Sequence, residues 1–452
     1  MTTSNTSLAR QLFTMTWPML FGVLSLMSFQ LVDSAFIGQL GILPLAAQGF
    51  TLPLQMVIIG IQVGLGIATT AVISKALGAE KLQYARQLAG LILLFGAVGV
   101  ALVCVIIWFL RHVILSLLGA PESVYAVIDA YWPYWLISAW VGAMLYFFYS
   151  ICRSNGNTML PGTMMMLTSG LNLVLDPLFI FTFDLGINGA ALATIVAFGI
   201  GIMIVAPKVH RHSWVSFDRH DLDVVNSVKA VGHIMGPAMI SQLLPPLSSM
   251  LATKLIAGFG TAAIASWALG SRFEFFTLVS VLALTMSMPP MVGRLLGAKN
   301  FADIRSLVSI ACRFILFFQT SLAIISLLVS AWLSSLMTSD HQVEEILNLH
   351  LTIIPISLGA LGICMLMVSI CNALGRSYTA LRISALRLFA FFLPALWLGA
   401  ELGGIQGLFI GAAIGNVLAG LVAWLTYRSA INQLAAIDST DTSLSTRYPE
   451  RK

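Results

Sequence analysis

Long apolar stretches recur along the whole chain, and they constrain its fold more than any other feature. The protein has 452 residues, of which 58% are hydrophobic and only 9% charged, whereas soluble proteins carry about 25% charged residues. Many of the stretches reach the roughly 20 residues that cross a bilayer as a helix. A spanning β-barrel would require short alternating segments instead, and the sequence lacks them. We therefore predict an all-α integral membrane protein.

The hydropathy pattern predicts twelve transmembrane helices with mostly short connections. They cover residues 12–37, 45–73, 88–110, 124–150, 159–183, 188–207, 236–257, 263–292, 307–334, 344–371, 379–400 and 406–428. The longest connection, 208–233, is mixed in charge, and we interpret it as a cytoplasmic linker. Residues 433–452 are mostly polar, and we predict a disordered cytoplasmic tail there.

Positive charges are distributed unevenly between the two sets of connections. The odd-numbered connections hold Lys75, Arg86 and Lys208 among others, whereas the even-numbered ones hold Arg111 and several acids. Because cytoplasmic loops are enriched in Lys and Arg, this asymmetry predicts a multi-pass protein of the inner (plasma) membrane with both termini in the cytoplasm. The five cysteines are scattered and lack metal-ligand spacing, so we expect neither a disulfide framework nor a metal site.

The sequence also aligns with itself, without gaps over some seventy residues, when one half is shifted by a constant offset onto the other, and further on a slip of one residue brings Gly186 to Gly189 onto Gly404 to Gly407. Pro18 falls on Pro237, Gly41 on Gly260, Gly78 on Gly297, Arg86 on Arg305 and Gly156 on Gly375. We therefore predict an N-terminal half (1–207) and a C-terminal half (234–432). Each half has an even number of spans, so both insert in the same orientation, related by a pseudo-two-fold axis along the membrane normal. Transporters built from repeats bind at the repeat interface and move one half against the other, so transport is favoured over a channel or a scaffold.

Two carboxylates lie inside apolar spans of the first half, at positions where the second half has no acid. Asp33 follows a stretch from Leu12 to Val32 without a charged residue, and Asp176 lies in the segment NLVLDPLFIF. The repeat places Ala252 at the position of Asp33, so the fold itself does not require an acid there. A charge at this depth costs several kcal/mol unless something compensates it.

A stripe of residues continues from Asp176 along one face of the fifth span. Met165, Ser169 and Asn172 precede it at spacings of four, three and four. Hydrogen-bonded packing between helices is the alternative interpretation, but the carboxylate at the end of the stripe favours function. If Asp33 and Asp176 lie close together, they share a proton or ligate a cation. Burial and a neighbouring negative charge both favour the protonated form of a carboxyl group, as proton coupling requires.

Further polar residues join this set. Tyr131 and Thr194 are candidate hydroxyl partners on the fourth and sixth spans, and Gln30, with Met165 and Ser169, is expected to line a substrate cavity. Pro18 lies fifteen residues before Asp33 and frees a backbone carbonyl. It produces either a static kink or a hinge that responds to protonation of Asp33.

The second half has intramembrane charges of its own. They are Lys254, Arg272, Glu274, Arg382 and Arg387. We expect ion pairs among them within the helix bundle. The alternative is that Glu274 faces a cavity and attracts cationic substrates.

The segments WPML, VDSAFIGQLG and NLVLDPLFIF, together with twelve spans in two halves, give the chain a recognisable pattern. It resembles the multidrug and toxic compound extrusion (MATE) transporters, especially their DinF-like branch, over residues 8 to 432. The resemblance implies a V-shaped protein with a central cleft that exports amphiphilic, often cationic drugs and other xenobiotics in exchange for protons or sodium. It further implies a cation-coupling site formed by Asp33, Asn172, Asp176, Tyr131 and Thr194, with bending of the first helix at Pro18.

Proton coupling is the favoured expectation, with sodium as the alternative. The family's other main branch uses carboxylates in spans seven and ten, and the interiors of these spans contain none here. An intramembrane aspartyl protease normally has a Gly-x-Gly-Asp context, which the sequence lacks. A lipid-precursor flippase would need basic cavity groups, and Arg272, Arg382 and Arg387 keep that alternative open. We expect a secondary active transporter rather than an enzyme, with no cofactor beyond the coupling ion, no metal, no nucleic-acid partner, contact with membrane lipids, and a monomeric state.

Overall fold

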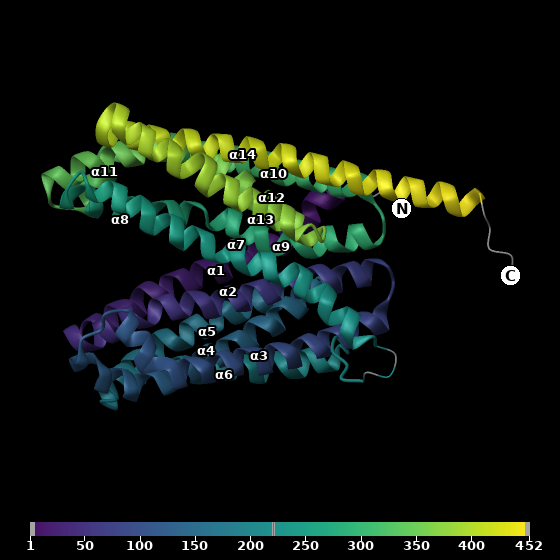
Figure 1. Ribbon diagram of the computed structural model, residues 1–452, viewed down its shortest axis with the longest axis horizontal. Coiled ribbons are helices and arrows are strands. Elements are labelled where there is room, and N and C mark those ends of the chain that lie inside the picture. The colour runs from purple at the N-terminus through teal and green to yellow at the C-terminus, as the bar shows by residue number, and fades with distance from the viewer. Residues whose placement is uncertain (1–4, 219, 221, 448–452) are drawn as a thin grey trace. The chain divides into compact units, whose positions relative to one another are not determined.

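The computed structural model describes residues 5–218, 220 and 222–447, and these residues are almost entirely helical (Figure 1). The first half comprises α1 (Asn5–Gly38), α2 (Ile42–Gly78), α3 (Leu82–Leu117), α4 (Glu122–Ser154), α5 (Met159–Pro177), the π-helix η1 (Leu178–Thr182) and α6 (Gly186–Arg211). The second half comprises α7 (Val224–Ala257), α8 (Thr261–Thr277), α9 (Val279–Gly297), α10 (Phe301–Met337), α11 (His341–Ile353), the 3₁₀-helix η2 (Ile354–Ser357), α12 (Leu358–Ala373), α13 (Ser377–Ala385), the π-helix η3 (Leu386–Phe392) and α14 (Leu393–Arg447).

The twelve spans predicted from hydropathy are confirmed, although several are divided into shorter helices. The eighth is broken at Leu278 between α8 and α9, and the tenth contains η2, which begins beside Pro355. The last two spans meet within α14 at Gly403 and Gly404, whose backbone angles are not helical. Among the described residues, ten helical stretches are long and apolar enough to cross a membrane. The protein is therefore a multi-pass membrane protein.

The internal repeat is visible in the backbone. The shift that carries Pro18 onto Pro237 also carries the bounds of α1 (Asn5–Gly38) onto those of α7 (Val224–Ala257). The left-handed turn residues recur as well. Gly41 has a φ of 106° and Gly260 a φ of 97°, while Glu80 and Lys299 have φ values of 61° and 57°. Non-glycine residues seldom adopt such angles, so their recurrence reflects duplication of one six-helix unit.

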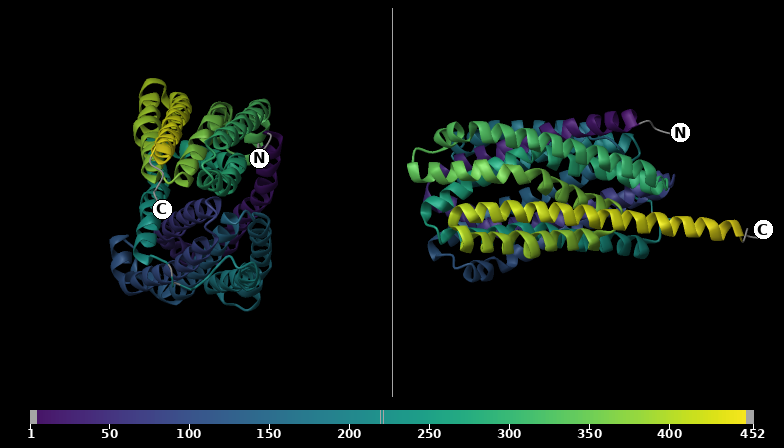
Figure 2. Two further views of the ribbon diagram at one scale, coloured as in Figure 1. Left: turned by 90° about the vertical axis from the view of Figure 1, so that its right-hand side faces the viewer. Right: turned by 90° about the horizontal axis from the view of Figure 1, so that it is seen from above.

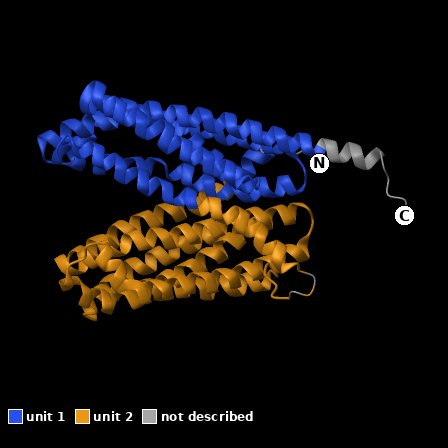
Figure 3. Ribbon diagram, in the orientation of Figure 1, with its two compact units in different colours: residues 1–12, 240–452 blue, residues 13–239 orange. Residues whose placement is uncertain are grey.

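The chain divides into two compact units, shown in Figure 3. The first unit of the text, unit 2 in Figure 3, runs from Phe13 to Met239. The second unit of the text, unit 1 in Figure 3, contains the residues from Ile240 onward together with those up to Leu12. This division lies inside α7, whereas the sequence analysis set the halves apart at the linker. Within the first unit α2 packs on α3 and α4, and α6 packs on α4 and α5. Within the second, α8 packs on α11, and α12 packs on α9 and α14.

The end of α14 differs from the sequence-based prediction. Residues 433–447 are helical where we expected disorder, and residues 448–452 of the predicted tail lie outside the described residues (Figure 2). The segment begins with Gln433, Leu434, Ala435 and Ala436, which favour the helix. Contacts with the turn before α10 and with α10 itself also hold it. Lys299 Nζ lies 2.5 Å from Asp438 Oδ1, and Arg305 Nη2 donates to Asn432 Oδ1 at 3.0 Å.

Candidate functional site

A cavity of about 560 Å³ lies within the first unit, between α1, α2, α4, α5 and α6. Its volume is in the range of small-molecule binding sites. Six aromatic side chains form much of its wall: Phe29, Tyr131, Trp135, Tyr146, Tyr149 and Phe198. Asp33 is the one charged residue among those that line it. The cavity is therefore apolar and aromatic, with a single acidic group in its wall.

A row of amides on α2 also faces this cavity, and the sequence analysis missed it. Gln48, Gln55 and Gln62 line the wall together with Thr51. Their spacing of seven residues corresponds to two helical turns, which puts the three amides on one face of α2. That spacing inside an apolar span was the signal available in the sequence.

Five of the residues predicted for the coupling site or the substrate cavity line this cavity. They are Gln30, Asp33, Tyr131, Met165 and Thr194. The rest of the predicted α5 stripe is buried outside the lining. Asn172 and Asp176 are each 0% exposed and Ser169 is 5% exposed. The stripe is therefore buried, but only Met165 reaches the cavity.

Several polar atoms of this region have no hydrogen-bond partner within the described part of the chain. They include both carboxylate oxygens of Asp176, the side-chain oxygen and nitrogen of Asn172, and Oδ1 of Asp33. The Asp33 carboxylate also interacts electrostatically with Asp176 and with Tyr131. A buried carboxylate without donors, close to a half-buried one, is costly to keep ionised. A bound proton or cation would remove most of that cost, so the pair has the chemistry of a cation-binding site.

Close backbone contacts position the two helices that carry these carboxylates. A Cβ atom on Gly162 of α5 would lie 2.4 Å from the carbonyl oxygen of Pro18, and one on Gly22 would lie 3.1 Å from Cα of Gly162. The helices α1 and α5 thus approach closely at the proline. Beyond Asp176, η1 is a π-helix, a form frequent at functional sites. A Cβ atom on Gly189 of α6 would lie 2.7 Å from the Phe179 backbone, so α6 packs directly on this turn.

In the second unit, Glu274 has a different partner from the one expected. Its Oε1 lies 2.7 Å from Nε2 of His350 on α11, whereas the sequence analysis expected pairing among the intramembrane Arg and Lys residues and Glu274. The expectation holds in part, because Glu274 also interacts electrostatically with Arg387. Its direct partner is His350, which was not among the charges considered. Glu274 is not among the residues that line the cavity described above, and its cavity role stays a prediction.

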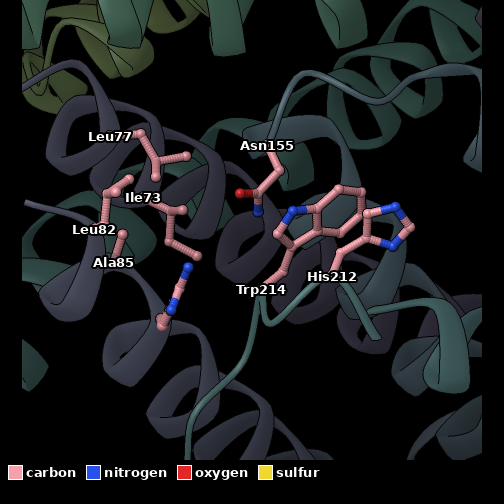
Figure 4. Close-up of a pocket in the computed structure, with 8 residues that line it drawn as sticks. Ile73, Leu77, Leu82, Ala85, Asn155, His212 and Trp214 are labelled. Atoms are coloured by element: carbon pink, nitrogen blue, oxygen red, sulfur yellow. The ribbon is translucent and has the colours of Figure 1, made fainter. Parts of the chain in front are cut away.

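A much smaller pocket, of about 130 Å³, lies where the linker folds back on the first unit (Figure 4). Its walls include Asn155, His212 and Trp214, whose side chains lie side by side in Figure 4. The imidazole of His212 stacks on the Trp214 indole with ring centroids 4.7 Å apart. The backbone N–H of Ser216 donates to the carbonyl of Arg86 at 2.9 Å, which fixes the linker. This pocket is too small for an amphiphilic drug, so the larger cavity is the candidate site.

Comparison with known proteins identifies the family. The MatE family model matches residues 18–178 and 237–397, one copy in each half, and the two copies begin at the aligned prolines Pro18 and Pro237. Among curated proteins, a FAD transporter of Shewanella oneidensis is 30% identical over 92% of this chain and 94% of its own length. The multidrug export protein MepA of Staphylococcus aureus is 23% identical over 90% and 91%.

Solved structures agree with this result. The Vibrio cholerae MATE transporter VcmN in the bent form is 69% identical and superposes with a TM-score of 0.94, covering 95% of this chain and 98% of its own. A mutant of the same transporter gives the same TM-score at 68% identity, covering 95% and 99%. These matches confirm the twelve-helix fold. They also confirm the prediction of a secondary transporter rather than an enzyme. The chain belongs to the MATE family of multidrug transporters, which are secondary transporters.

Proposed function

We propose that the protein is a proton-coupled antiporter that exports amphiphilic, often cationic compounds by alternating access. The observation that carries the proposal is the 560 Å³ aromatic cavity whose lining includes one charged residue, Asp33. Behind that wall, Asp176 is fully buried, and neither of its carboxylate oxygens has a partner in the described part of the chain. A large apolar cavity next to two acids suits the exchange of a lipophilic cation for a proton.

The lining suits a lipophilic cation for two physical reasons. Aromatic faces attract a positive charge, each contributing about 0.5–2 kcal/mol according to how completely the cation is desolvated. The ionised Asp33 would add direct attraction within a low-dielectric wall. Protonation of Asp33 removes that attraction, so the proton and the cationic substrate compete for one carboxylate. This competition is the basis of exchange.

Asp176 and Asn172 would serve as the second part of the coupling site. Asp33 and Asp176 interact electrostatically, so a proton on one lowers the cost of ionising the other. Tyr131 is 5% exposed and next to Asp33, and we assign it and Thr194 as hydroxyl partners. Sodium is the alternative coupling ion, because carboxylate and amide oxygens also bind cations.

Bending of α1 at Pro18 would couple the ion to the cavity. The ring of Pro18 removes a helical hydrogen bond, and Gly162 of α5 lies against this turn of α1. Related structures support the idea. VcmN is known in a bent form, and a MATE protein that is 22% identical, with a TM-score of 0.87, is known in the straight conformation. We assign both termini to the cytoplasmic side of the inner membrane and treat the protein as a monomer.

The test is efflux of ethidium in inverted membrane vesicles under an imposed pH gradient or an imposed sodium gradient. Wild type should transport with the pH gradient, and Asp33→Asn should lose that response. Asp184→Asn is the matched control, because Asp184 is exposed and its left-handed backbone (φ 53°) tolerates Asn. Unchanged pH-driven efflux in Asp33→Asn would refute the mechanism. Efflux that responds only to sodium would establish the alternative ion.

Flavin dinucleotide export is the second candidate, because one relative is named a FAD transporter. The aromatic wall would stack with an isoalloxazine ring. The residues that line the cavity include no Lys or Arg to bind the diphosphate, so a cationic substrate fits better. The same vesicles should therefore accumulate ethidium but not FAD, and FAD transport that Asp33→Asn leaves unchanged would reverse this ranking.

A further inference from the structure

The second half contains a group of three ionisable side chains, one of them fully buried, that the proposed mechanism does not use. Nε2 of His350 on α11 lies 2.7 Å from Oε1 of Glu274 on α8, and the His350 side chain is 0% exposed. Arg387 in η3 interacts electrostatically with Glu274, and its Nε is buried without a partner in the described part of the chain. One acid and one imidazole thus pair inside an apolar bundle, within electrostatic range of a guanidinium.

Aromatic rings and a glycine hold the imidazole in place. The ring centroids of Trp267 and Phe409 lie 5.4 Å and 5.1 Å from that of His350, both with edge contacts. A Cβ atom on Gly270 would lie 2.4 Å from the imidazole. Only glycine at this position leaves room for the His350 ring, because any larger residue would occupy the same space. These contacts fit the shape of the His350 ring. They indicate a site that holds this side chain in one orientation.

The internal repeat relates this group to the cavity of the first half. At the offset that carries Pro237 onto Pro18, Glu274 corresponds to Gln55, His350 to Tyr131 and Arg387 to Thr168. Trp267 and Gly270 correspond to Gln48 and Thr51. All five counterparts line the first-half cavity. The group therefore occupies the position in the second half that corresponds to the ligand cavity of the first half. Its charged and aromatic residues stand where the first half has neutral amides and hydroxyls.

The hydrogen bond uses one ring nitrogen of His350 and leaves the other unpaired. Nε2 faces the Glu274 carboxylate, and Nδ1 has no partner in the described part of the chain. The neighbouring elements contribute Glu274 from α8, Arg387 from η3, Phe409 from α14, and the uncharged Gln319 and Ser326 from α10. Of these, Gln319 donates to the carbonyl of Thr277, and Ser326 donates to that of Leu351.

A proton arriving at Nδ1 would create an imidazolium that keeps its bond to the Glu274 carboxylate. The carboxylate is then shared between two cations, His350 and Arg387, and its interaction with each changes. Because Glu274 belongs to α8 and His350 to α11, the change acts on the contact between these two helices. Protonation here is a local event with consequences for packing in the second half.

We propose that His350 and Glu274, with Arg387, form a second protonation site, in the position of the second half that corresponds to the first-half cavity. Its role in coupling rests on the proposed function, because a second proton site matters only in a proton-driven transporter. The binding of a proton by this group does not rest on it. The two parts are therefore tested separately.

Proton binding is tested by NMR of the purified full-length protein, labelled in its histidine rings and titrated from about pH 5 to pH 9. His350→Gln assigns the signal, and Glu274→Gln should displace its titration along the pH axis. His341→Gln is the matched control, an exposed histidine at the start of the same helix. If His350→Gln does not fold, the signal that responds to Glu274→Gln identifies the ring. A His350 ring that stays in one protonation state throughout overturns the proposal.

The coupling role is tested by the pH dependence of ethidium efflux in proteoliposomes. Glu274→Gln should alter the pH profile while Asp33→Asn abolishes the response to the pH gradient. If Asp33→Asn leaves the response intact, the proposed function fails, whatever happens at His350. If Asp33→Asn abolishes it but Glu274→Gln and His350→Gln both keep the wild-type profile, the second site has no part in coupling.

Discussion

Replacement of Gly162 by Ala tests the contact on which the proposed hinge depends. An added Cβ would lie 2.4 Å from the Pro18 carbonyl oxygen and 2.6 Å from its carbon, both backbone atoms that cannot rotate away. Because real Cβ contacts lie at 3.0 Å or more, α1 and α5 would have to separate by at least 3.0 − 2.4 = 0.6 Å. Overpacking of this kind costs about 1–3 kcal/mol.

The control lies on the same helix. Gly170 has open space around it, so Gly170→Ala adds only the preference of Ala for a helix, about 0.5–1 kcal/mol of stabilisation. That preference is common to both variants and cancels in their difference. Gly162→Ala should therefore be less stable than Gly170→Ala by about 1–3 kcal/mol in the free energy of unfolding. The measurement is unfolding of each purified variant by SDS in detergent micelles.

Transport should follow the same order. Separation of the helices at Pro18 changes the turn where α1 is expected to bend, so Gly162→Ala should slow pH-driven efflux of ethidium, and Gly170→Ala should not. If the two variants match in stability and in efflux, α1 and α5 do not meet at Pro18 in the membrane, and the hinge would have to lie elsewhere.

Four further outcomes are expected. Asp176→Asn should abolish pH-driven efflux yet retain exchange of labelled for unlabelled ethidium at equal pH. The variant loses a coupling group, whereas Asp33 keeps the cavity wall intact. Loss of both activities would instead indicate a structural role for Asp176. Gly270→Ala should destabilise the protein by about 1–3 kcal/mol, since its Cβ would meet the His350 ring, and SDS unfolding beside Gly236→Ala, which has open space, measures this. The five native cysteines are buried and free, so a maleimide should label Gln48→Cys in the cavity far faster than wild type, and equal rates would contradict the cavity. Asp438→Ala removes an ion pair with Lys299, which is 64% exposed, and should change the free energy of unfolding by less than about 1 kcal/mol, with efflux unchanged.

Hydropathy and the internal repeat were sufficient to predict the helices. Apolar length decides which segments span a bilayer, and a gapless offset carries the turns of one half onto the other, as Gly41 and Gly260 illustrate. The break at Leu278 was not predictable in this way, because its counterpart Ile59 lies inside the continuous helix α2. The helical end of α14 was missed because a polar composition was given more weight than the helix preference of Leu434 and its neighbours.

The candidate site was only partly predictable. A carboxylate in an apolar span, such as Asp33 or Asp176, can be recognised from the sequence alone. The free-energy cost of burying its charge does not depend on which residues surround it. Gln55 cannot be recognised in this way, because amides are common in membrane spans. Its role depends on which face of α2 borders the cavity. The pairing of Glu274 with His350 joins residues 76 positions apart on α8 and α11. Such a contact depends on how two helices pack, and neither periodicity nor composition contains that information.

Proton release on substrate binding tests the central claim most directly. Ethidium is added to purified protein in weakly buffered detergent solution, and the pH is followed with an indicator dye. Exchange of a proton for a cation at Asp33, assisted by Asp176, predicts that wild type and Asp184→Asn release protons, whereas Asp33→Asn does not and Asp176→Asn releases fewer. Equal release by all four proteins would contradict the account.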